Sequence, residues 1–302
     1  MKNKISVTFK KFDSCIIPVD KLSTLLFDAD VDGLDSIIED PKNNIESPVK
    51  IIYPRDEHGK QIILTPFEKK IFCILLSAQN SGNNYISYSK LFHLLGGGTD
   101  IARATSLITA IDTALWKLRC TDLTVNLTDI VSARKKYASK LNVPYNRKDK
   151  TKILWRGVLL PNEVLTASIN GKISESVIHF LDKSILFDIA DLKDQIARVD
   201  LKLLQVPIRT TEQTINLSGY LLERIIKIKG SIDKAHVTKL EHSISLNTLY
   251  KQCGIPAEKK EQRQTIRRNI LKIMDFFKKK DFISDYNLVK NGIGELSIKI
   301  FF

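Results

Sequence analysis

The sequence predicts an α+β protein in which two similarly built halves follow an acidic N-terminal arm. Three observations carry this prediction. The first 63 residues are rich in Asp and Glu and are interrupted by prolines. After them, two long stretches of apolar residues at helical spacing are each followed by strand-like alternation. These stretches predict domains over 64–206 and 207–302, after an arm over 1–63.

The composition predicts a folded chain with a polyanionic partner. Of the 302 residues, 43% are hydrophobic, which is enough for a core of ordinary size. Lys and Arg outnumber Asp and Glu by 47 to 34, which gives a formal net charge of +13. A surplus of this size favours nucleic acid or an anionic membrane surface, and the alternative is a charge that serves solubility alone.

Targeting signals and cysteine motifs are both lacking in the sequence. No run approaches the roughly 20 apolar residues of a membrane helix, and the basic start lacks the apolar core of a signal peptide. We therefore expect a cytoplasmic protein without a membrane partner. The cysteines form no CxxC pair, which predicts reduced thiols rather than a zinc site or disulfides. They are Cys15, Cys73, Cys120 and Cys253.

The first half begins with a strong helix-start signal. In the stretch Thr65–Glu68, a capping threonine precedes a proline at the first helical position, and Glu68 has capping-box spacing. A short helix is expected over 88–95, where a run of three glycines stops it. A third helix is expected over 99–119, with an apolar stripe at helical spacing.

Strand signals complete the first half. Alternation predicts strands over 122–127 and 153–160. The pair Asn170-Gly171 between two apolar segments predicts a two-residue hairpin. The segment 188–206 starts with a helical pattern and ends with a strand-like one, and we interpret it as the connection to the second half.

The second half repeats this order. Thr210 and Gln213 have capping-box spacing at the start of a helix expected to end at Gly230. Ser245 is expected to cap a short helix. The remaining elements are a short helix over 246–253, a long helix over 258–279, and strands over 282–288 and 295–301. Both halves thus follow the order of a winged helix-turn-helix, so we expect two such domains in tandem.

The long helix of the second half is the main candidate for reading DNA. Four apolar residues from Ile266 to Phe277 share one face, and basic and amide side chains lie opposite. Arg and Gln can each form paired hydrogen bonds with a base, and Lys binds phosphates. The alternative is an ordinary solvated face. The expected contacts are Lys260, Arg263, Gln264, Arg267, Arg268 and Lys272.

A basic segment in the first half is a second candidate for DNA contact. Between residues 134 and 156, basic residues alternate with Tyr and Trp, as in loops that embrace a phosphate backbone. A mobile surface loop with no partner is an equally good interpretation. The residues expected to contact DNA are Arg134, Lys135, Lys136, Arg147, Lys148 and Lys150.

The acidic arm contains one sharp motif. Residues from Asp28 through Gly33 to Glu39 fit the pattern of an EF-hand loop. Asp35 occupies a position that is usually apolar, Pro41 would break the exiting helix, and the chain has no second loop. We therefore favour an acidic surface loop over a calcium site.

Catalytic and cofactor signals are missing. The sequence has no phosphate-binding P-loop motif, and the five histidines form no HxH or HExxH pair. No combination of a nucleophile and a base stands out. We therefore expect a non-catalytic protein without a cofactor.

From Leu64 to Phe302 the layout resembles a known family, the theta-type plasmid replication initiators that bind iterons with tandem winged-helix domains. The motifs that carry the resemblance are Leu64–Ile71, Ile111–Leu118, Val206–Glu212 with Tyr220–Ile225, and Ile273–Ile283. They are motifs of packing and capping. The resemblance implies that the second domain reads the major groove of repeated origin sites.

The resemblance also implies a role for the first domain, which would contact the DNA backbone or minor groove and supply a dimer interface. The bound initiator would recruit host replication proteins, among them the host initiator and the replicative helicase. A winged-helix transcriptional regulator would share all these features. A nuclease or relaxase would need a metal-carboxylate or tyrosine site that the sequence does not display.

Overall fold

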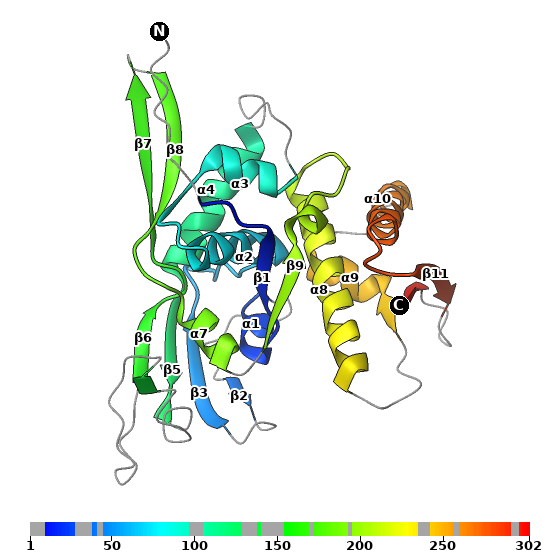
Figure 1. The fold of residues 1–302 in the computed structure, drawn as a ribbon, viewed down its shortest axis with the longest axis horizontal. Helices are drawn as coiled ribbons and strands as arrows, with labels where there is room; N and C mark the ends of the chain where they lie inside the picture. Colours follow the sequence, from blue (N-terminus) through cyan, green and yellow to red (C-terminus); the bar gives the residue numbers. More distant parts are fainter. Residues whose placement is uncertain are drawn as a thin grey trace.

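The computed structural model shows a mixed α/β fold of helices and small sheets, running from the first half on one side to the second on the other (Figure 1). None of the described helices is long and apolar enough to cross a membrane. The structure describes residues 10–27, 38–40, 45–96, 105–128, 138–139, 154–169, 172–192, 195–234, 242–255, 260–290 and 296–302.

Three helices form the centre of the first half, as the sequence predicts. They are α2 (Pro66–Asn80), α3 (Tyr88–Leu94) and α4 (Thr105–Cys120). The capping box at the start of α2 is formed, because Thr65 accepts from the Phe67 amide while Glu68 accepts from the Thr65 amide. Residues 99–104 of the third expected helix lie outside the described part of the chain.

A three-stranded sheet covers these helices, in the order β4-β8-β7. Its strands are β4 (Tyr85–Ser87), β7 (Asn162–Ile169) and β8 (Lys172–Phe180). The predicted hairpin is confirmed, because β7 and β8 are antiparallel with Ile169 opposite Lys172. The two strands extend well beyond the helices as a long arm (Figure 1).

The strands predicted over 122–127 and 153–160 are also present, but they belong to a different sheet. That sheet has the order β2-β3-β5-β6. Its strands are β2 (Ile38–Asp40), β3 (Ile45–Ile52), β5 (Asp122–Asn126) and β6 (Leu154–Val158). The segment between α4 and the long hairpin therefore pairs with β3 from the N-terminal arm.

The N-terminal arm also contributes β1 (Ser14–Pro18) and α1 (Lys21–Leu26) to the core. Strand β1 pairs with β9 (Ile196–Asp200), far along the chain. The Ile16 amide donates to Ser77 Oγ of α2 at 2.7 Å. The segment 188–206 contains the end of α7 (Ile185–Leu192), then β9, then the 3-10 helix η3 (Leu201–Leu204).

The second half contains the three expected helices and the two expected C-terminal strands, together with one short strand before the second helix that the sequence did not predict. They are α8 (Glu212–Lys234), β10 (Ser243–Ser245), α9 (Leu246–Gln252), α10 (Lys260–Lys279), β11 (Asp285–Lys290) and β12 (Leu296–Phe301). The sheet order is β10-β12-β11. Helix α8 continues past Gly230, where the sequence predicts its end, because Gly230 does not adopt the left-handed conformation that ends helices.

The start of α8 differs from the prediction. Thr211 and Thr214 form the reciprocal cap, since the amide of each donates to the hydroxyl of the other at 2.9 and 3.2 Å. Thr210, predicted as the capping residue, instead donates its hydroxyl to the Gly96 carbonyl at 2.6 Å. The cap is therefore one residue later, and Thr210 links the second half to the end of α3.

The two halves share one topology. Each has a long helix, a three-residue strand, a seven-residue helix, a second long helix and a hairpin. In each sheet the short first strand pairs with the last strand of the hairpin, giving the orders β4-β8-β7 and β10-β12-β11. The segment with β5 and β6 interrupts this order in the first half only.

Candidate nucleic-acid interface

Helix α10 is anchored through one apolar face. The residues that the sequence places on this face are buried, and Met274 joins them. The Phe277 ring packs edge-on against Phe282 at 5.7 Å between centroids. The buried set is Ile266, Ile270, Ile273, Met274 and Phe277. Because this face is fixed in the core, the orientation of the opposite face is fixed as well.

The opposite face of α10 carries the predicted base-reading side chains. Arg263, Gln264, Arg268 and Lys272 are exposed. Arg268 donates from Nη2 to Thr265 Oγ1 at 3.2 Å, one turn earlier. In the described part of the chain, neither Arg268 nor Lys272 forms an ion pair. Their charges are therefore directed to the solvent, where an anionic ligand could meet them.

Arg267 differs from its neighbour Arg268. Its side chain is half-buried, and its Nε has no hydrogen-bond partner among the described residues. It lies near the Tyr250 hydroxyl of α9. Burial raises the pKa of Tyr250, and the nearby positive charges of Arg267 and Arg263 oppose that rise. Arg267 thus lies where α9 meets α10, while Arg268 lies on the outer face of α10.

The hairpin of β11 and β12 is tied to the C-terminal half of α10. Tyr286 donates its hydroxyl to Asp275 Oδ1 at 2.7 Å, and Lys278 pairs with Asp285 at 2.9 Å. Burial and the Asp275 carboxylate raise the pKa of Tyr286, so its hydroxyl remains a donor. These contacts leave the N-terminal half of α10, with Gln264 and Arg268, uncovered by the described part of the hairpin.

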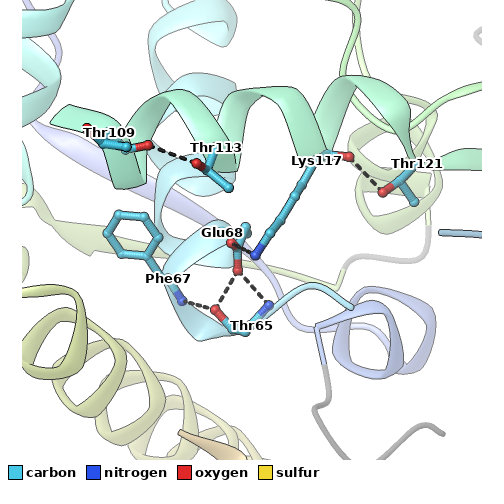
Figure 2. A network of polar contacts seen from close by, with 7 residues as sticks. All are labelled: Thr65, Phe67, Glu68, Thr109, Thr113, Lys117 and Thr121. Atoms are coloured by element: carbon cyan, nitrogen blue, oxygen red, sulfur yellow. Dashed lines mark hydrogen bonds and ion pairs between the residues drawn. The ribbon is translucent and has the colours of Figure 1, made fainter. Parts of the chain in front are cut away.

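Helix α4, which occupies the same place in the first half, presents different chemistry. Its exposed side chains include Thr109, Thr113 and Trp116 but few cations. The Thr109 hydroxyl donates to the Thr105 carbonyl one turn earlier. Figure 2 shows that the Thr113 hydroxyl donates in the same way to the Thr109 carbonyl. It also shows Lys117 turned inward, where its Nζ meets Glu68 Oε1 at 2.6 Å. The exposed face with Arg263, Gln264, Arg268 and Lys272 therefore belongs to α10, and α4 presents no comparable face.

Several predicted contacts lie outside the described residues. The backbone of Lys260 is the start of α10, but its side chain is not described. The candidate calcium loop is also outside, apart from Glu39 in β2. Among the described residues, no three His, Cys, Asp or Glu side chains could together hold a metal ion. The remaining undescribed contacts are Arg134, Lys135, Lys136, Arg147, Lys148 and Lys150.

Sequence reasoning missed two features of this interface. It placed Arg267 to one side of the exposed arc of the helix but still counted it, with Arg268, as a DNA contact, because an angular position around a helix does not show how deeply a neighbouring helix buries a side chain. It also did not foresee that Tyr286 and Asp285 fasten the hairpin to α10. A Tyr and an Asp on a strand gave no pattern that indicates a helix partner.

Comparisons with known proteins find only distant likenesses. No protein-family model and no curated protein matches the chain. Two solved structures that match are crystal structures of domains 2 and 3 of RctB, both with 11% identity and a TM-score of 0.38. A selenomethionine form covers 84% of this chain and 86% of its own, and the other covers 92% and 95%. A likeness at this level decides neither the fold nor the function.

Proposed function

We propose that the chain is a non-catalytic, sequence-specific DNA-binding protein that reads double-stranded DNA with α10. The observation that carries the proposal is the two-sided character of this helix. Its apolar face is fully packed, and its opposite face presents Gln264, Arg268 and Lys272 to the solvent. Arg and Gln are the side chains that best read guanine and adenine in the major groove, and a helix fits that groove.

The proposal includes two winged-helix domains in tandem. The shared order of elements and the shared sheet order support it, as does the position of α10 after a short capped helix. In this interpretation β11 and β12 form the wing of the second domain. The long β7–β8 hairpin is the wing of the first, and β5 and β6 form an insertion within the first domain.

Within this class we propose a replication initiator that acts in the cytoplasm on repeated origin sites of a plasmid or mobile element. The resemblance of the segments Leu64–Ile71 and Ile273–Ile283 to that family supports this choice. The proposed partners are double-stranded DNA, a host initiator, the replicative helicase and a second copy of the chain. The second candidate, a winged-helix transcriptional regulator, fits the same surface of α10.

The first test is footprinting on the DNA that flanks the coding region. We expect protection of direct repeats, and the same DNA should sustain a replicon when the protein is supplied. Protection of a single operator without replication would favour the regulator instead. A chain that protects no sequence over a scrambled control would contradict sequence-specific binding.

A further inference from the structure

A pocket lies at the junction between the two halves, away from the exposed face of α10. Its walls come from α2, α8 and α9, together with Phe27 after α1. The pocket has a volume of about 200 Å³. This is smaller than the roughly 300–1,000 Å³ of pockets for drug-sized ligands, so it suits a compact group.

The charged side chains of the pocket are mostly positive. Glu223 of α8 is the only acid among its described lining residues, and Lys69, Arg224 and Lys227 are the cations. Among the described lining residues, three positive charges against one negative charge leave a surplus of two. Glu223 already binds two of the cations, with Lys69 Nζ at 2.7 Å and Lys227 Nζ at 2.5 Å.

The ion pairs of Glu223 are sheltered from water. The side chain of Glu223 is 15% exposed and that of Lys69 is 7% exposed. Burial alone would raise the pKa of Glu223, but the ammonium groups of Lys69 and Lys227 lower it below its usual value. Glu223 is therefore ionised at neutral pH, and it holds the ammonium groups of Lys69 and Lys227 close to Arg224, which lines the same pocket.

Arg224 supplies a second, independent sign that the pocket suits an anion. Its Nε is buried and has no hydrogen-bond partner among the described residues. A buried donor without an acceptor destabilises the folded state, and the effect is larger when the group is charged. The guanidinium lines the same pocket as Lys69 and Lys227, so one oxyanion there could accept from Arg224 and offset the surplus charge.

We propose that this junction pocket binds a compact phosphate-bearing ligand. Phosphate offers several acceptor oxygens, which suit the unpaired Nε of Arg224, and up to two negative charges, which suit the mostly positive described lining. Thr248 of α9 also lines the pocket, and a threonine hydroxyl can donate to a phosphate oxygen. Because α2 comes from the first half and α8 and α9 from the second, the bound ligand stabilises the packing of the two halves.

The test is calorimetric titration of the full chain with sodium pyrophosphate in a chloride buffer. We expect one site per chain in the wild type and at least tenfold weaker binding in Arg224→Gln. The matched control is Arg119→Gln, which removes an exposed arginine of α4 and should leave binding unchanged. Pyrophosphate should also raise the Tm of the wild type and the control but not that of Arg224→Gln.

A second variant tests whether misfolding, rather than loss of the guanidinium, explains weaker binding by Arg224→Gln. Glu223→Gln removes the one negative charge of the described lining, so we expect it to bind pyrophosphate more tightly than the wild type. A misfolded chain would not gain affinity. Equal binding by Arg224→Gln and Arg119→Gln would overturn the proposal. So would binding that appears only after the acidic run that follows Phe27 is neutralised by Asp28→Asn and Asp30→Asn.

The source of the phosphate is decided by two further titrations. One replaces pyrophosphate by adenosine diphosphate, and the other adds pyrophosphate to a chain already saturated with a short duplex. Binding of adenosine diphosphate, with or without the duplex, identifies a free nucleotide as the ligand. Loss of pyrophosphate binding when the duplex is present identifies a phosphate of the DNA backbone.

Discussion

Ser87 and Ser245 occupy the same position in the two halves of the molecule. Each is the last residue of a three-residue strand and the N-cap of a seven-residue helix. The Ser87 hydroxyl accepts from the Lys90 amide at 3.2 Å, and the Ser245 hydroxyl accepts from the Thr248 amide at 3.4 Å. In both halves, a serine side chain therefore accepts a hydrogen bond from an amide in the first turn of the helix, which would otherwise have no acceptor.

The ends of the two short helices correspond as well. Gly96 and Gly254 follow their C-caps with φ values of 96° and 59°. In this left-handed region a side chain is disfavoured, so glycine is the residue that ends such a helix at low cost. Serine before and glycine after thus fix both short helices at seven residues, although the sequences between them differ.

The first prediction concerns these two caps. Ser87→Ala and Ser245→Ala should each lower the free energy of unfolding by about 1 kcal/mol, because each leaves a helix amide without its acceptor. Urea unfolding followed by circular dichroism measures the loss. The control is Ser89→Ala, an exposed position within α3, which should change stability by less than about 0.5 kcal/mol. A loss at one cap alone would contradict the equivalence of the two positions.

The second prediction concerns Glu68, which joins α2 to α4. Its carboxylate accepts from the Thr65 amide at 2.7 Å, from the Thr65 hydroxyl at 2.5 Å and from Lys117 Nζ at 2.6 Å (Figure 2). Glu68→Ala should cost about 3–5 kcal/mol, because it leaves the Lys117 ammonium buried without a counter-ion. Thr65→Ala, which loses only the cap, should cost about 1 kcal/mol.

Thermal and urea unfolding of both variants check this order. Glu57→Ala provides the control, since that carboxylate is exposed and away from α4. Equal losses in Glu68→Ala and Thr65→Ala would show that the ion pair with Lys117 adds nothing to the cap.

The parts of the fold that could be predicted depend on residues close together in the chain. The capping box of Thr65 and Glu68 spans four residues, so it can be recognised from the local sequence alone. The buried face of α10 follows from a repeat of three and four residues between Ile266 and Phe277. Both are local rules, and local rules do not need the rest of the chain.

The parts that could not be predicted depend on distant pairings. Ser14 of β1 lies opposite Asp200 of β9, and Val49 of β3 lies opposite Val125 of β5. The sequence of each strand contains no pattern that predicts which other strand it pairs with. The junction pocket is similar, because Lys69 and Glu223 meet only after α2 and α8 have packed. Lys69 and Lys70 are buried because α2 is covered on nearly all sides. From the sequence alone, two adjacent lysines would be predicted to lie on the surface.

The third prediction is a strong salt dependence of DNA binding. We expect at least about five phosphate contacts, and each contributes about −0.9 to the slope of log affinity against log salt concentration. Lys272→Ala should weaken binding to all sequences alike and reduce the slope by about one unit, because Lys272 is placed to meet a phosphate. Lys148→Ala should behave in the same way. Binding that stays flat from low to moderate salt would contradict a nucleic-acid role.

The fourth prediction concerns Lys70, which is buried at the junction and donates from Nζ to the Leu204 carbonyl at 2.9 Å. Burial lowers the pKa of Lys70 from 10.5 to about 8. Between these two values the unfolded chain holds a proton that the folded chain has released. Stability due to this group therefore rises with pH across the window from about 8 to 10.5.

The measurement compares the wild type with Lys70→Met by urea unfolding at pH 7 and pH 10. The difference between the two proteins should shift in favour of the wild type by about 2 kcal/mol at the higher pH. The subtraction removes the titration of all other groups that the two proteins share. A difference that stays constant with pH would mean that Lys70 titrates as an ordinary exposed lysine.

The last prediction separates Arg267 from Arg268, which are adjacent in sequence and chemically identical. Arg268 is exposed on the outer face of α10, so Arg268→Ala should cost about 1–3 kcal/mol on the specific site and relax the preference at one base position. Its free energy of unfolding should stay within about 0.5 kcal/mol of the wild type.

Arg267→Ala should give the opposite pattern. Arg267 lies half-buried near Tyr250, so its loss should lower the stability of the α9–α10 pair and weaken binding to all sequences alike. Fluorescence anisotropy with specific and scrambled duplexes measures discrimination, and urea unfolding measures stability for each variant. If Arg268→Ala leaves discrimination untouched while Arg267→Ala or Lys148→Ala abolishes it, α10 does not read the bases through its exposed face.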